Sequence, residues 1–153
     1  MVPVVGGRTR FQPVWVDDVA QAAALLAAGR AAPGTYELGG PEVLSFRELM
    51  DKMLGIIRRR RLVADIPFGI AGLMGTVGGW GEALSGGLAR PPITRDQVDA
   101  LRSDNVVAPG ALGFEALGIA PTALDAVLPD YLWRFRPSGQ YDAIKESARN
   151  LRA

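Results

Sequence analysis

Apolar positions recur with the spacing of one helical face between residues 45 and 58, where the pattern is clearest. The residues at this spacing are Phe46, Leu49, Met50, Met53, Leu54 and Ile57. Ser45 and Glu48 stand three positions apart at the start and predict a capping box. Arg58–Arg61 follow, where positive charge suits a helix C-terminus. The pattern therefore predicts a helix with both ends marked.

Two acidic residues mark the start of another helix. Asp17 and Asp18 precede alanine- and leucine-rich positions, and carboxylates stabilise a helix N-terminus. We expect them to cap this helix and Gly29 to end it. A pair of carboxylates could also serve as an acid/base site, but their position favours capping.

Two later segments also have helical character. Thr94 and Gln97 predict a second capping box, which opens a helix to about Arg102. A further helix is expected to begin near Thr122, with a kink or restart at Pro129.

Short β-rich runs alternate with these helices. They comprise Val2–Val5, Phe11–Val16, Thr35–Leu38 and Leu62–Ile66. Strands that alternate with helices predict an α/β fold with short parallel strands and several helices. So few short strands make a thin sheet, and its exposed edge favours pairing, including a homodimer.

Composition excludes several classes of chemistry. The net charge of +1 argues against a nucleic-acid binder. The chain has no cysteine and no histidine, which excludes Ser-His-Asp, Cys-His and zinc catalysis and favours no metal site. The first residues lack the basic start and apolar run of a secretory signal, so we expect a cytoplasmic protein.

Four segments, in order, carry a family resemblance. They read PVWVDDVAQAAALL, GTYELGGPEVLSFRELMDKM, ITRDQVDALRSDNV and FEALGIAPTALDAVLPDYLWRFR. The first two resemble the C-terminal half of extended short-chain dehydrogenase/reductase-like proteins, the NAD-dependent epimerase/dehydratase group. The last two narrow the resemblance to the nucleotide-binding accessory subunits of NADH:ubiquinone oxidoreductase (complex I) and their alphaproteobacterial relatives. The resemblance covers residues 3–137.

The resemblance implies a Rossmann-type domain that holds NADP(H), followed by a smaller C-terminal lobe. Residues 1–136 would form that lobe and residues 137–153 a polar tail. The glycine fingerprint that cradles a diphosphate does not precede Phe11, so we expect the dinucleotide-binding part to be absent and this chain alone to hold no cofactor. The expected partners are a missing Rossmann part or the peripheral-arm subunits of complex I.

The resemblance makes a non-catalytic accessory or assembly lobe the leading hypothesis for function. One alternative is the substrate-binding lobe of an active NAD(P)-dependent epimerase or reductase. Another is a module that binds a membrane surface, with peripheral contact at the inner membrane. The resemblance does not by itself decide whether the whole protein is an enzyme.

Gln12 and Trp15 are the candidates for a substrate cleft. In the related fold this strand runs beside the cleft, where an indole can stack on a ring and an amide can hydrogen-bond. Their spacing places them on opposite strand faces unless Pro13 introduces a bulge. Phe11 occupies the place of the arginine that pairs with a sugar-nucleotide phosphate in the epimerases, which argues against such a substrate.

Arg58–Arg61 and Trp80 are the candidates for a membrane surface. They flank or belong to the apolar segment Ile66–Gly81, which is shorter than the roughly 20 residues that span a bilayer. Basic residues beside such a segment can rest on anionic lipid. The competing interpretation is a solvated helix end followed by a core segment, and we favour it.

Two motifs imitate catalytic or phosphate-binding signatures. Tyr141 and Lys145 spell the Y-x-x-x-K of the dehydrogenases, but they follow the PVWVDD segment instead of preceding it. Gly75–Gly81 lacks the strand-turn-helix setting of a phosphate loop, and close helix packing or a loose loop explains it better. We therefore assign no catalytic residue and no cofactor-binding residue.

Overall fold

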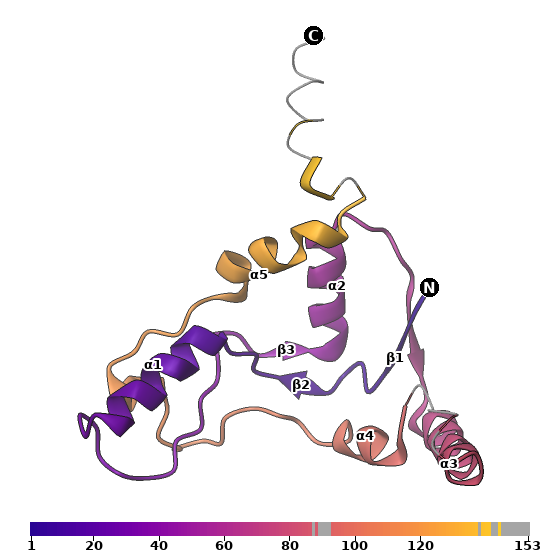
Figure 1. Ribbon diagram of the computed structural model, residues 1–153, viewed down its shortest axis with the longest axis horizontal. Helices are drawn as coiled ribbons and strands as arrows, with labels where there is room; N and C mark the ends of the chain where they lie inside the picture. Colours follow the sequence, from indigo (N-terminus) through magenta and orange to yellow (C-terminus); the bar gives the residue numbers. More distant parts are fainter. Residues whose placement is uncertain (87, 89–92, 138, 142–143, 145–153) are drawn as a thin grey trace. The chain divides into compact units, whose positions relative to one another are not determined.

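The computed structural model describes residues 1–86, 88, 93–137, 139–141 and 144 of the chain. The chain divides into two compact units (Figure 1). The first comprises Met1–Phe11, Leu44–Leu49 and Leu62–Val106, and the second comprises Gln12–Val43, Met50–Arg61 and Val107–Ala153.

The first unit contains two small sheets. Strand β1 (Val2–Val5) pairs in parallel with β4 (Val63–Ile66), and Val2 lies opposite Val63. Strand β2 (Arg10–Phe11) pairs antiparallel with β3 (Leu44–Ser45). The predicted strands Val2–Val5 and Leu62–Ile66 are therefore confirmed, the second of them from Val63. The broader prediction of a small α/β structure with short parallel strands is also confirmed.

Two helices cover the first unit's core. They are α3 (Phe68–Leu84) and α4 (Arg95–Ala100). Val5, Ala71 and Val98 are buried together, and four partly buried residues pack around them, namely Ile66, Phe68, Ile93 and Leu101. The predicted capping box opens α4, since the Thr94 hydroxyl and the Gln97 side chain each bond the other residue's backbone N–H.

Helix α2 (Phe46–Ile56) begins at the other predicted capping box. The Glu48 carboxylate accepts from the Ser45 N–H at 2.8 Å, and the Ser45 Oγ accepts from the Glu48 N–H at 3.2 Å. The helix ends earlier than its arginines. Arg58 already has a left-handed φ of 53°, so Arg58–Arg61 lie beyond the helix.

The second unit contains α1 (Val16–Ala27), the part of α2 from Met50 onward, and α5 (Leu124–Leu132), with single 3-10 turns between α1 and α5 and after α5. These turns are η1 (Phe114–Leu117), η2 (Trp133–Phe135) and η3 (Gly139–Tyr141). Gly29 ends α1 as predicted, because its φ of 66° lets its N–H and that of the next residue bond back to the last turn. Pro129 lies inside α5 without dividing it.

The segment Phe11–Val16 corrects the sequence analysis. Only Phe11 belongs to a strand, and Val16 already opens α1. Pro13 has no N–H to donate to a ladder, and the backbone after it approaches Gly40 so closely that a Cβ there would lie 1.9 Å from the Pro13 oxygen. The predicted strand Thr35–Leu38 is likewise reduced to a single bridge between Tyr36 and Leu112.

The predicted capping role of Asp17 and Asp18 is wrong in detail. The N-cap of α1 is Trp15, which makes no side-chain capping bond. Both carboxylates lie in the first helical turn, where they still suit the positive end of the helix dipole. Asp18 is buried and bonds Thr122 instead of the helix end.

Candidate functional site

The Gln12 side chain serves as an internal brace. Its amide nitrogen donates to the Gly40 carbonyl at 2.8 Å, and its amide oxygen accepts from the Val107 N–H at 3.0 Å. Gly39 is a glycine because a Cβ there would lie 2.5 Å from the Gln12 Cδ. These two bonds fix the orientation of the Gln12 amide between the Gly40 and Val107 backbones.

Trp15 lines a small apolar pocket of about 240 Å³ in the second unit. Its walls come from the entry to α1 and from α5, and comprise Val14, Trp15, Val16, Thr122, Leu124, Val127, Leu128 and Tyr131. The Trp15 Nε1 is buried and has no hydrogen-bond partner among the described residues. Of the two cleft candidates, Trp15 is therefore the one that borders a cavity.

A larger cavity of about 800 Å³ lies wholly within the first unit, and the sequence analysis missed it. Residues from β1, β2, β4, α2, α3, α4 and the segment after α4 line it, among them Val5, Phe11, Ile66 and Leu101. The Phe11 and Phe46 rings meet edge to face at 5.8 Å between centroids. The wall is mostly apolar, so the cavity suits an apolar group or chain segment.

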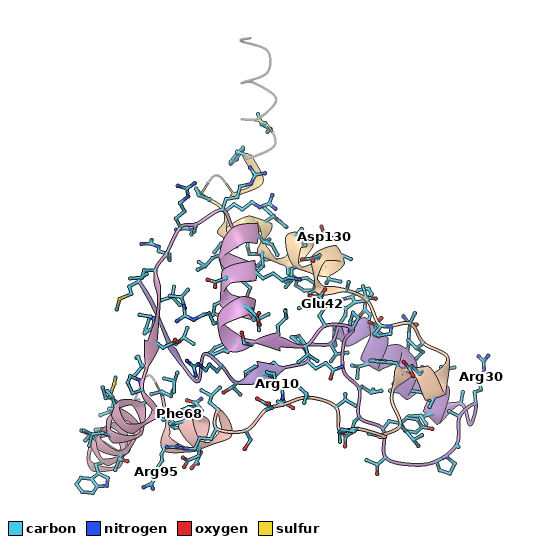
Figure 2. All side chains as sticks on the ribbon, turned by 180° about the vertical axis from the view of Figure 1, so that it is seen from behind. Arg10, Arg30, Glu42, Phe68, Arg95 and Asp130 are labelled. Atoms are coloured by element: carbon cyan, nitrogen blue, oxygen red, sulfur yellow. The ribbon has the colours of Figure 1, made fainter. Side chains whose placement is uncertain are left out.

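The charged group at this cavity is already paired. Arg10, which is labelled in Figure 2, donates to both oxygens of Asp104, through its backbone N–H and its Nε, each at 2.8 Å. The backbone bond is the largest influence and the side-chain bond the next, and together they hold the pKa of Asp104 below its usual value. Such a carboxylate stays ionised near neutral pH and makes a poor proton donor or acceptor there.

The turn after β1 does not fit the diphosphate of a dinucleotide. Gly6 and Gly7 follow the strand, and the chain then enters β2. The N-terminus of α2 faces this turn, but its Arg47 N–H already donates to the Gly7 carbonyl at 3.0 Å and is not free to bind a phosphate. The Asp65 carboxylate is so close that a Cβ on Gly7 would lie 2.3 Å from its Oδ1. That carboxylate would repel a phosphate, although Arg47 pairs with its other oxygen at 2.6 Å.

Arg58–Arg61 are exposed and belong to the second unit. Arg59 Nε donates to the Phe135 carbonyl at 3.0 Å, and Arg136 Nε donates to the Ile56 carbonyl at 3.0 Å. The structure thus brings a second arginine-containing segment to the predicted one.

Trp80 belongs to the first unit and is 71% exposed. It continues a line of exposed apolar side chains along α3, which are Ile70, Leu73, Met74 and Val77. The glycine-rich segment Gly75–Gly81 is part of the helix α3. Helix α4 packs closely against it at Gly75, where a Cβ would lie 2.9 Å from the Arg95 backbone nitrogen. In the part of the chain that the structure describes, no helix has both the length and the apolar character needed to cross a bilayer.

The Y-x-x-x-K motif of Tyr141 and Lys145 lies mainly outside the described residues. Tyr141 is exposed in η3, whereas Lys145 and most of the predicted tail are not described. Within the described residues, no three acidic side chains gather as a metal site would require.

Together the structure defines a small α/β protein in which both of these cavities are mostly apolar. No family model matches the chain. It is 37% identical over 143 residues to NADH dehydrogenase (ubiquinone) 1 alpha subcomplex subunit 9, mitochondrial, of Arabidopsis thaliana, covering 90% of this chain and 36% of that protein. It is 29% identical over 138 residues to the NADH-ubiquinone oxidoreductase 40 kDa subunit, mitochondrial, of Neurospora crassa, covering 90% of this chain and 35% of that protein.

The chain is therefore homologous to these NADH dehydrogenase subunits over nine-tenths of its length, and the resemblance drawn from the sequence is confirmed. It spans about a third of the length of either relative.

Proposed function

We propose that this chain is a non-catalytic lobe of an NAD(P)-binding, epimerase-like accessory subunit of complex I. The observation that carries the proposal is the 37% identity, over 90% of this chain, to a protein named as a subunit of NADH dehydrogenase. The expected partners are other subunits of that complex. We place the chain on the cytoplasmic side, in peripheral contact with the membrane that holds the complex.

The two cavities support a structural role. The larger one has an apolar wall, and its ionised group, Asp104, is held by Arg10. The smaller one is bordered by Trp15 and Thr122, neither of which titrates near neutral pH. Such walls favour burial of apolar groups over proton transfer.

The proposal assigns NAD(P)(H) binding only to a full-length protein comparable in length to the relatives, not to this chain alone. The turn at Gly6 and Gly7 leads into a strand and lies beside the Asp65 carboxylate, which supports the proposal that this turn does not hold the diphosphate. Any nucleotide would therefore be held by residues outside the part described here.

The proposal is tested by tagging the chromosomal copy in its native host and dissolving the membranes in a mild detergent. The tagged protein should migrate with active NADH:ubiquinone oxidoreductase on a native gel, and deletion should reduce the amount of assembled complex. A tagged short-chain dehydrogenase of the same host is the control for non-specific recovery. Migration apart from the complex, or steady NADPH-dependent reduction of sugar nucleotides or ketones by the purified protein, would overturn the proposal in favour of the enzyme alternative.

A further inference from the structure

Two arginine-containing segments distant in sequence form one surface in the second unit. One is Arg59–Arg61, directly after α2, and the other is Trp133–Arg136, in and after η2. Two hydrogen bonds hold them together, from Arg59 Nε to the Phe135 carbonyl and from Arg136 Nε to the Ile56 carbonyl, each at 3.0 Å. We call these two segments the arginine face.

The arginine face is strongly and uniformly charged. Its two segments contain five arginines and no acidic residue. Arg59 and Arg136 each use one guanidinium nitrogen, Nε, in the hydrogen bonds that join the two segments. Arg60, Arg61 and Arg134 are exposed and form no ion pair within the residues that the structure describes. Three whole guanidinium groups therefore remain available to an outside partner.

Aromatic side chains are exposed beside these charges. Trp133 is 38% exposed and Phe135 is 54% exposed. Tryptophan and arginine are the residue types that most often dominate the binding energy of protein interfaces. A patch that combines them differs from an ordinary solvated helix end, in which lysine would serve equally well.

The charge and hydrogen-bonding groups of the face indicate the chemistry of the partner. Every cation of the face is arginine, as are 15 of the 17 basic residues of the chain. Guanidinium groups pair with carboxylates through two parallel hydrogen bonds, and arginine is enriched at protein interfaces. An anionic membrane would also attract these cations, and the accessory-subunit role favours a protein surface over lipid.

We propose that the arginine face docks on a protein surface rich in aspartate and glutamate carboxylates. This names the chemistry of the partner in the accessory-subunit role and therefore rests on the proposed function. Carboxylates of the partner would pair with Arg60, Arg61 and Arg134, while the Trp133 and Phe135 rings lose water at the contact.

The test reverses the three unpaired charges and leaves the brace intact. The tagged protein carries R60E/R61E/R134E, and the control carries R8E/R30E/R95E, which changes net charge equally at other exposed arginines. We expect the first variant to recover on the order of tenfold less complex I subunits than wild type, because like charges that face each other across an interface repel. The control should retain most of the recovery, and circular dichroism should show both variants folded.

A third variant, R60K/R61K/R134K, separates paired hydrogen bonds from charge alone. We expect it to lose part of the recovery, since lysine keeps the charge but not the planar fork. Equal recovery of complex I subunits by wild type and R60E/R61E/R134E would overturn the docking proposal while leaving the accessory role intact. No recovery by wild type would overturn both.

Vesicle flotation distinguishes the membrane alternative. Purified wild-type protein is mixed with phosphatidylcholine vesicles that contain about one-third phosphatidylserine. Flotation that R60E/R61E/R134E abolishes, together with unchanged recovery of complex I subunits, would assign the face to lipid and overturn its assignment to a protein. Absence of flotation, together with loss of subunit recovery, supports the proposal.

Discussion

The Asp18 carboxylate joins the start of α1 to Thr122, two residues before α5, across 104 positions of sequence. Its Oδ2 accepts from the Thr122 N–H at 2.6 Å, and its Oδ1 accepts from the Thr122 hydroxyl at 3.0 Å. Asp18 is only 2% exposed, so both bonds form away from water. The two hydrogen bonds offset the free-energy cost of burying the carboxylate. They also fix Thr122, which lines the Trp15 pocket, to α1.

Replacement of Asp18 should therefore destabilise the protein. We expect Asp18→Ala to lower the free energy of unfolding by about 1–3 kcal/mol, because the partly buried Thr122 donors lose their acceptor. Thr122→Val should cost less, about 0.5–1.5 kcal/mol, because the backbone N–H keeps its bond. Urea denaturation followed by tryptophan fluorescence measures both values. Asp17→Ala is the control, since Asp17 is exposed in the same turn, and an equal effect of both aspartate variants would contradict this account.

Two glycines three residues apart in α3 should respond oppositely to alanine. At Gly72 a Cβ would meet nothing within 4 Å, whereas at Gly75 it would lie 2.9 Å from the backbone nitrogen of Arg95. We expect Gly72→Ala to raise the free energy of unfolding by about 0.5–1 kcal/mol through the higher helix propensity of alanine. Gly75→Ala should lower it by about 1–3 kcal/mol, because α4 must move. Thermal denaturation of both variants checks the signs, and stabilisation by both would show that α3 and α4 do not pack at Gly75.

Local signals were predictable from the sequence, because they depend on residues within one turn. Both capping boxes lie where Ser45 with Glu48, and Thr94 with Gln97, place them. Gly29 ends α1 because a left-handed residue is needed there. The same reasoning failed for Arg58, which takes the left-handed conformation that a glycine usually provides.

Features that join distant positions were not predictable. The larger cavity combines Pro3 with Asn105, and no local pattern relates them. The strand expected through Val16 failed because Pro13 breaks the ladder and Gly40 admits the backbone beside it, a contact visible only in three dimensions. Asp18 was assigned to capping because its partner, Thr122, lies 104 positions away. For the arginine face, the sequence indicated only the first segment, because the second segment joins it through tertiary hydrogen bonds.

Gln12 should behave as a structural residue. Gln12→Ala removes the partner of the Gly40 carbonyl and of the Val107 N–H, and we expect it to lower the free energy of unfolding by about 1–3 kcal/mol. Gln21→Ala is the matched control, because Gln21 is exposed on α1 and should change stability by less than about 0.5 kcal/mol. Chemical denaturation of the two variants measures the free energies of unfolding to be compared. Indistinguishable stabilities would return Gln12 to the candidates for a ligand contact.

The two capping boxes should differ in their dependence on pH, because one contains a carboxylate and the other an amide. The side-chain bond from Ser45, followed by its backbone bond, lowers the pKa of Glu48 below its ordinary value of 4.5. A lowered folded-state pKa means that the stabilisation is complete above about pH 4.5 and is lost as pH falls through the folded-state value. The cost of Glu48→Ala should therefore be larger at pH 7 than at pH 3, whereas the cost of Gln97→Ala should be the same at both. Urea denaturation of the wild type and both variants at the two pH values gives the comparison. A cost of Glu48→Ala that does not change with pH would show that its carboxylate does not cap α2 in solution.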